Sequence, residues 1–162
     1  MAKELQRLRQ GLRTLKRDIP KILDIALISV QSEMVKRIHS KGQDANGNKI
    51  GNYSTTPISV SKKNQPRSSG KTYFSGGYKS FKQSMGLESG FVNLELTGQM
   101  RQDLTIIPLT PRSSAIGFKN PFNADKSDWM ENKYKKPIYE NTKKELKIFN
   151  DVFDFETMKR LR

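Results

Sequence analysis

The sequence of 162 residues contains no cysteine. Disulfide bonds, thiolate metal sites and a cysteine nucleophile are therefore excluded, and the fold must rest on packing and hydrogen bonds. The sequence also has only one histidine, His39, which excludes a metal site built from two histidines of one chain. A histidine at the end of a basic helix is more often a capping or surface group than a general base, so we expect His39 near the surface.

Long hydrophobic runs are also missing. No segment approaches the roughly 18 consecutive apolar residues of a membrane span, and the start of the chain has no apolar core of a signal peptide. Hydrophobic residues make up 34% of the sequence and the mean hydropathy is -0.74, which predicts a small core with much of the chain exposed or covered by partners. We expect a protein that is made and kept in the cytosol and does not contact a membrane.

Acidic residues are scarce relative to basic ones. The sequence has 16 Asp and Glu against 30 Lys and Arg, which gives a net charge of +14. A domain with this charge repels its own copies unless polyanions or acidic surfaces neutralise it. The composition therefore indicates an acidic partner, either nucleic acid or protein.

The first residues predict an amphipathic basic helix over residues 1–19. Its apolar face consists of leucines at spacings of three and four, Leu5, Leu8, Leu12 and Leu15. Both packing on the domain's own surface and contact with another subunit explain such a face. Pro20 is expected to end or kink this helix, and a second helix should run to about His39. Residues 20–162 are expected to form one domain.

Residues 42–82 are rich in Gly, Asn, Ser, Pro and Lys, which predicts an extended loop or arm. Basic and aromatic side chains gather in its second half: Lys62, Lys63, Arg67, Lys71, Tyr73, Phe74, Tyr78, Lys79, Phe81 and Lys82. Such residues bind phosphates and stack on bases. They are equally typical of an arm that becomes ordered between neighbouring subunits, so the sequence leaves a DNA-facing arm and a subunit interface both open.

The rest of the chain predicts a small antiparallel sheet followed by helices. Apolar and polar residues alternate over residues 91–96, and residues 104–109 and 115–118 are further strand candidates. Residues 125–134 are expected to form a short helix, and the pair Thr142 and Glu145 has the spacing of a capping box for a C-terminal helix. The predicted class is α+β, with the sheet packed by the long N-terminal helix and the C-terminal helices.

Motifs for chemistry are incomplete. Gly70-Lys71-Thr72 resembles the end of a phosphate-binding loop, but Gln65 occupies the first glycine position. Asp44 begins an alternation typical of calcium loops, yet the glycine and glutamate that such a loop requires are missing. Asp125 and Asp128 are explained by the start of a helix. We therefore predict no enzymatic activity, no cofactor and no metal site.

One motif carries a family resemblance. The segment LELTGQM, from Leu94 to Met100, is followed by short strands and by Ile-Gly-Phe at residues 116–118. Together with the N-terminal amphipathic helix, this order resembles the phage virion-morphogenesis family of tail-completion and neck proteins. In that family the turn equivalent to Thr97 and Gly98 joins a strand to a short helical turn before the next strand.

The resemblance implies a structural virion protein of a tailed bacteriophage, added late in maturation in the host cytoplasm. It implies a homo-oligomeric ring in the neck, between the portal or its adaptor and the tail, with those proteins as partners and genomic DNA as a further contact. It transfers no catalytic residue. The alternative hypothesis is a basic DNA-binding protein that organises or packages a genome.

Overall fold

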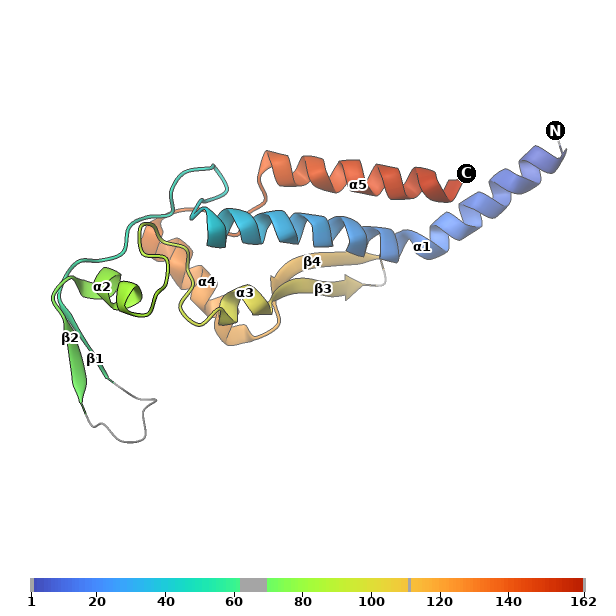
Figure 1. The fold of residues 1–162 in the computed structure, drawn as a ribbon. Coiled ribbons are helices and arrows are strands. Elements are labelled where there is room, and N and C mark those ends of the chain that lie inside the picture. The colour runs from blue at the N-terminus through green and yellow to red at the C-terminus, as the bar shows by residue number, and fades with distance from the viewer. Residues whose placement is uncertain (1, 62–69, 111, 162) are drawn as a thin grey trace.

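The computed structural model describes residues 2–61, 70–110 and 112–161. The molecule is elongated, and helix α1 (Ala2–Val35) runs along most of its length (Figure 1). Helix α5 (Lys143–Leu161) lies along one side of α1, and a hairpin of strands β3 (Leu104–Thr110) and β4 (Ser113–Phe118) lies along the other. The predicted α+β class is confirmed.

The N-terminal helix continues through Pro20. Proline has no amide proton for the carbonyl of Lys16, four residues earlier, and its ring crowds that carbonyl, so a helix passes through it only by bending. Figure 1 shows α1 bent between its projecting N-terminal part and the part that packs against α5. Of the two expectations for Pro20, an end or a kink, the structure has the kink, and residues 1–19 do not form a helix of their own.

A single π-helical turn, η1 (Lys36–Ser40), extends α1. The chain then turns sharply at Gly42, whose φ of +61° lies in the left-handed region. A Cβ atom at this position would lie 2.2 Å from Cδ2 of Phe91 and 2.8 Å from the carbonyl oxygen of Val92. Both the backbone angle and the close approach of residues 91–92 therefore require glycine here.

The core lies where the C-terminal end of α1 and η1 meet β3 and three irregular segments, around residues 50, 92 and 138. Its buried members are Met34, Ile38, Ile50, Val92, Leu104 and Ile138. Towards the N-terminus the core narrows to Ile22, Ala26 and Val30, which are buried on α1 at intervals of four residues. Because this spacing keeps them on one side of the helix, they pack the part of α1 from residue 22 onwards against the rest of the fold.

Among the described residues, strands β3 and β4 pair only with each other, and the predicted third strand at residues 91–96 is wrong. Leu94 has a φ of +52°, which is incompatible with an extended strand. Side-chain hydrogen bonds to Asn93 and a lysine bond to the carbonyl of Glu95 hold this segment in place of a ladder. Burial does not follow the alternation of residue types either, because Val92 and Asn93 are both buried and Leu96 is 37% exposed.

Residues 42–82, predicted as an extended loop, contain regular structure. Strands β1 (Ile58–Ser61) and β2 (Lys71–Phe74) form an antiparallel hairpin, and helix α2 (Gly77–Ser84) follows. Figure 1 shows that the hairpin projects from the end of the molecule opposite to the N-terminus. The predicted loop conformation is therefore wrong for β1, β2 and α2, whereas residues 42–57 are irregular apart from one isolated bridge between Gln43 and Lys49. Residues 62–69 lie outside the described part of the chain.

Two short helices complete the fold. Helix α3 (Gln99–Asp103) follows the turn at Gly98, and α4 (Pro121–Tyr134) begins four residues earlier than predicted. Proline suits the first turn of a helix, and the Asn120 side chain accepts a hydrogen bond from the amide of Phe122, so the helix starts there.

Candidate interaction surfaces

The leucine face of α1 is largely uncovered at its N-terminal end. Leu5, Leu8 and Leu12 are 53%, 54% and 52% exposed, and only Leu15 is half-buried. Helix α5 ends beside Gly11, so most of the stripe extends beyond the last turn of α5 (Figure 1). We call Leu5, Leu8 and Leu12 the leucine stripe. About half of the surface of each stripe residue is thus left open, although Leu8 lines a pocket with Arg160 and Leu161 of α5.

The predicted arm divides into residues that the structure places and residues that it does not. Lys62, Lys63 and Arg67 lie outside the described residues. Lys71 and Tyr73 are exposed neighbours on one face of the hairpin. Lys79 is half-buried on α2.

The aromatic residues of the arm mainly pack on one another. The ring of Phe74 meets that of Phe81 at 5.5 Å, Phe81 meets Tyr78 at 5.7 Å, and Tyr78 meets Tyr53 at 5.4 Å. The tilted and edge-on geometries are those that aromatic pairs favour. These contacts join the hairpin to α2 and α2 to Tyr53, so three of the four predicted aromatic contact residues stabilise the base of the arm, and Tyr73 is the exposed exception.

The prediction that Lys82 faces DNA or a neighbouring subunit is wrong, because its side chain is fully buried. Its Nζ donates to the Tyr53 hydroxyl at 2.9 Å, to Oδ1 of Asn93 at 2.7 Å and to the carbonyl of Glu95 at 2.7 Å. These three acceptors use all three protons of the ammonium group. Desolvation lowers the pKa of Lys82, and the hydrogen bonds offset that burial.

The prediction that His39 lies near the surface is wrong, because His39 is buried. It contacts the backbone carbonyl of Asn93, whereas Lys82 binds the Asn93 side chain. Its Nδ1 is 2.9 Å from the carbonyl oxygen of Asn93, which can only accept, so Nδ1 carries the proton. Desolvation lowers the pKa of His39 and favours the neutral ring. Burial also raises the pKa of Tyr53 to about 12, which keeps its hydroxyl protonated as the donor to Oδ1 of Asn93.

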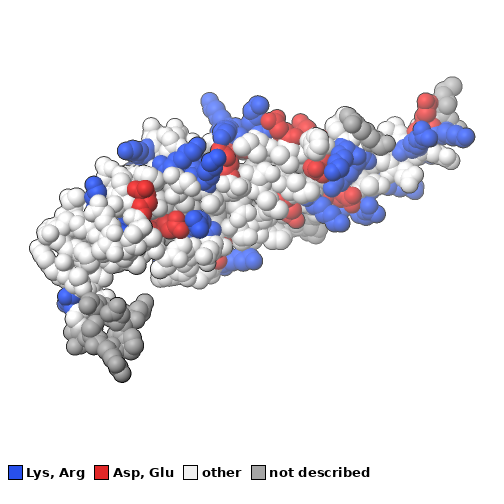
Figure 2. All heavy atoms as spheres, in the orientation of Figure 1, with Lys and Arg blue, Asp and Glu red and all other residues white. Residues whose placement is uncertain are grey.

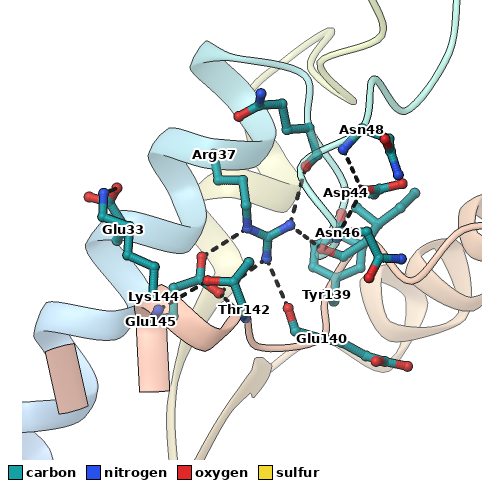
Figure 3. A network of polar contacts seen from close by, with 12 residues as sticks. Glu33, Arg37, Asp44, Asn46, Asn48, Tyr139, Glu140, Thr142, Lys144 and Glu145 are labelled. Carbon is teal, nitrogen blue, oxygen red and sulfur yellow. Dashed lines mark hydrogen bonds and ion pairs between the residues drawn. The ribbon is translucent and has the colours of Figure 1, made fainter. Parts of the chain in front are cut away.

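A second buried network joins the C-terminal segment to the end of α1 (Figure 3). The Arg37 guanidinium donates to both oxygens of Glu145, at 2.8 and 3.4 Å, and to the carbonyls of Ile138, Glu140 and Gln43. The Thr142 amide donates to Glu145 at 2.7 Å and the Glu145 amide donates to the Thr142 hydroxyl at 3.0 Å, so the predicted capping box is confirmed. The sequence gives no sign that Arg37 binds Glu145, because Arg37 is one of many basic residues in the N-terminal part of the chain.

The turn at Thr97 and Gly98 begins a short helix, as the resemblance implied, although no strand precedes it. Gly98 has a φ of +74°, and the Thr97 hydroxyl accepts a hydrogen bond from the amide of Gln99. This turn forms one wall of a cleft of about 480 Å³, and helix α4 forms the opposite wall. The sequence did not indicate this cleft.

Charge is distributed rather than concentrated. On the face shown in Figure 2, basic side chains occur along the α1 and α5 part of the molecule with acidic ones between them. On that face the basic side chains therefore do not gather into a single patch. Such a surface attracts polyanions without defining a narrow path for them.

The acidic residues of the described part of the chain do not gather into a metal site. No group of three or more His, Asp or Glu side chains among them could hold a metal ion. Oδ1 of Asp44 accepts hydrogen bonds from the amides of Asn46 and Asn48, so this residue closes a turn. Among the helices that the structure describes, none combines the length and apolar character needed to cross a membrane.

No family model, no curated protein and no solved structure matches the chain.

Proposed function

We propose that the chain is a structural subunit of a tailed-phage virion that assembles into a ring in the neck, between the portal or its adaptor and the tail. The observation that supports this proposal best is the leucine stripe, Leu5, Leu8 and Leu12, at the projecting end of α1. Each of these side chains is about half exposed, so complete burial by a neighbour would contribute about half of the roughly 1.5–3 kcal/mol that burying a fully exposed leucine gives. A neighbouring subunit that covers the stripe would explain why three leucines stand at exposed positions of the helix.

The shape of the molecule supports an interface between unlike ends. The stripe lies at one end, and the β1–β2 hairpin projects from the other (Figure 1). A contact between two different surfaces of the same chain is heterologous, and heterologous contacts close into rings when the rotation between subunits permits. An isolated two-stranded hairpin is marginally stable in water, so a neighbour's surface against β1–β2 would also stabilise it.

The resemblance of residues 94–100 to virion-morphogenesis proteins gives the ring its proposed location. The net charge of +14 fits a position next to DNA or to acidic neck proteins. A basic DNA-binding protein that organises a genome is the competing hypothesis, and the same charge favours it. Burial of Lys82 and mutual packing of the aromatic residues remove part of the binding surface on which that hypothesis relied.

Mass spectrometry of purified virions from the phage that encodes the chain tests the location. We expect the protein in the particles, and in the isolated neck a ring of fixed copy number by native mass spectrometry. The purified protein alone should be a monomer or a weakly associating oligomer. Absence from purified particles would overturn the proposal, and site-specific binding to duplex DNA without incorporation would favour the competing hypothesis.

A further inference from the structure

The cleft between α4 and residues 94–100 lies away from the leucine stripe, and its lining is mainly apolar. Leu96, Met100 and Met130 line it, together with the aromatic rings of Tyr78 and Trp129. Its volume of about 480 Å³ is within the range of about 300–1,000 Å³ typical of ligand sites. Trp129 lines this cleft and yet remains 55% exposed, which is unusual for a large apolar ring.

Helix α4 presents alternating aromatic and basic side chains beside the cleft. Phe122, Lys126, Trp129 and Lys133 follow at intervals of four, three and four residues, so they form one stripe along the helix. Nζ of Lys126 lies 4.3 Å from the centre of the Phe122 ring, and Nζ of Lys133 lies 4.8 Å from that of Trp129. These cation–π contacts hold the ammonium groups over the rings.

The charge around the cleft is positive. Among the described residues that line it, Lys126 and Lys133 are basic and Glu95 alone is acidic. Glu95 is already paired with Arg101, whose Nη1 is 3.3 Å from the carboxylate. Helix α4 also carries Asp125, Asp128 and Glu131, but none of them lines the cleft, and Glu131 accepts hydrogen bonds from the amides of Ile138 and Tyr139. A ligand in the cleft therefore meets an apolar floor and a rim with uncompensated positive charge.

The backbone of the opposite wall is strained. Leu94 has a φ of +52°, one of two non-glycine residues with positive φ in the described chain, and Gly98 has a φ of +74°. A non-glycine residue in this conformation costs roughly 1–3 kcal/mol and is retained where the surroundings over-determine it. The buried ammonium of Lys82 supplies that restraint by binding the carbonyl of Glu95. This hydrogen bond therefore restrains the wall of the cleft beside Leu94.

From these observations we infer that the cleft binds an acidic peptide segment of a partner protein, with large aliphatic side chains inserted between Trp129 and Leu96. Lys126 and Lys133 would attract the carboxylates, and the apolar floor would accept the aliphatic anchor. A single-stranded nucleic acid fits less well, because its bases would stack on exposed rings and leave the aliphatic floor unused. The inference concerns a different surface from the leucine stripe and does not depend on assembly into a ring.

Trp129 is the only tryptophan in the chain, so its fluorescence reports on the cleft directly. The probe is a short Trp-free peptide of Asp, Glu, Ser and Gly with two adjacent central leucines. We expect a saturable blue shift of Trp129 emission as the peptide covers the ring. Three comparison ligands should produce no saturable shift: the same peptide with serines for the leucines, a version with lysines for the acids, and oligothymidylate.

Variants of the full chain locate the binding. Lys126→Ala combined with Lys133→Ala should weaken the affinity about tenfold, measured by polarisation of a labelled peptide. Lys143→Ala combined with Lys159→Ala removes the same charge from exposed positions on α5 and should leave the affinity unchanged. Leu96→Ser should weaken binding as well, and because Leu96 is partly exposed this variant should keep the fold, which circular dichroism checks.

The inference fails if the acidic leucine peptide produces no saturable shift. It fails equally if the serine peptide, the basic peptide or oligothymidylate binds as tightly as the acidic leucine peptide. Equal effects of the α4 and α5 lysine pairs would show that net charge alone drives binding. If Leu96→Ser does not fold, the two lysine pairs still decide between these outcomes.

Discussion

Arg37 and Glu145 are 108 residues apart in the sequence and form a buried ion pair, with Nε of the arginine 2.8 Å from Oε1 of the glutamate. The same glutamate caps the first turn of α5 through the amide of Thr142. One carboxylate therefore both starts the C-terminal helix and holds that start against the end of α1. Beside it, Lys144 forms an exposed ion pair with Glu33 across the same two helices.

Replacement of Glu145 by alanine should destabilise the protein by about 3–5 kcal/mol, because the charge of Arg37 stays buried without its partner. Urea denaturation measures the change in unfolding free energy. Asp151→Ala is the control, since it breaks the exposed ion pair with Lys147 on the same helix and should change stability by less than about 1 kcal/mol. Similar losses in both variants would contradict a structural role for the buried pair.

Gly42 and Gly47 separate steric crowding from backbone strain, because both have positive φ. Gly47 has a φ of +80°, and a Cβ atom added there would have nothing within 4 Å, so Gly47→Ala should cost about 1–2 kcal/mol from strain alone. Gly42→Ala meets Phe91 and the Val92 carbonyl as well and should cost about 1–3 kcal/mol more. Thermal or urea unfolding compares the two, and an equal loss would refute the close packing of residues 91–92 on Gly42.

Lys82→Met should reduce the unfolding free energy by roughly 1–3 kcal/mol, because acceptor atoms of Asn93 and Glu95 lose their buried donor. Lys71→Met, at an exposed position of β2, should change stability by less than about 0.5 kcal/mol. In an assay of nonspecific DNA binding, the two variants should show the opposite order of effects. Loss of Lys71 should weaken it and flatten its salt dependence, whereas a properly folded Lys82→Met protein should bind as the wild type does.

Local sequence patterns predicted the elements whose residues contact close neighbours. The leucine spacing predicted the N-terminal part of α1, the apolar segment at residues 104–109 was a strand candidate and forms most of β3, and Thr142 with Glu145 predicted the start of α5. In each case periodicity or a cap of a few residues determines the local structure. These elements account for the α+β class.

The failures occurred where distant residues decide the conformation. Residues 91–96 alternate like a strand, but Tyr53, Lys82 and His39 occupy the hydrogen-bonding groups of Asn93, and Leu94 turns to positive φ. In the sequence, Lys82 looks like the other basic residues of the arm, because its three acceptors come from Tyr53, Asn93 and Glu95. The cleft combines residues 94–100 with helix α4, which are neighbours only in the folded chain. The spacing of residues along a sequence does not show which distant segments become neighbours in the fold.

Stability should decrease as the pH falls below about 6.5. Desolvation lowers the pKa of His39 from its ordinary value of 6.5, so the unfolded chain takes up the proton before the folded one does. The stabilisation is fully present above the unfolded pKa and is lost as the pH falls through the folded pKa. Urea midpoints between about pH 8 and 5.5 measure this loss, before most carboxylates titrate. His39→Gln should show a shallower dependence, and an unchanged slope would assign it to other groups.

The leucine stripe gives the direct test of assembly. Replacing Leu5, Leu8 and Leu12 together by glutamine keeps a good helix former at each position and removes the apolar face. Since all three side chains are already about half exposed, we expect the unfolding free energy of the body to change by less than about 1 kcal/mol.

Assembly should respond very differently from stability. In cells infected with a phage lacking its own copy of the gene, the triple leucine variant should be produced but fail to enter particles, as measured by mass spectrometry of purified virions. The control replaces Arg7, Arg9 and Arg13 by glutamine, which alters the same helix and removes three charges but keeps the stripe. If the leucine variant entered particles at the wild-type level while the arginine variant did not, charge rather than the apolar face would drive incorporation. Exclusion of the leucine variant alone would assign the contact to the stripe, because the two proteins share the same folded body and differ in which side of the helix is changed.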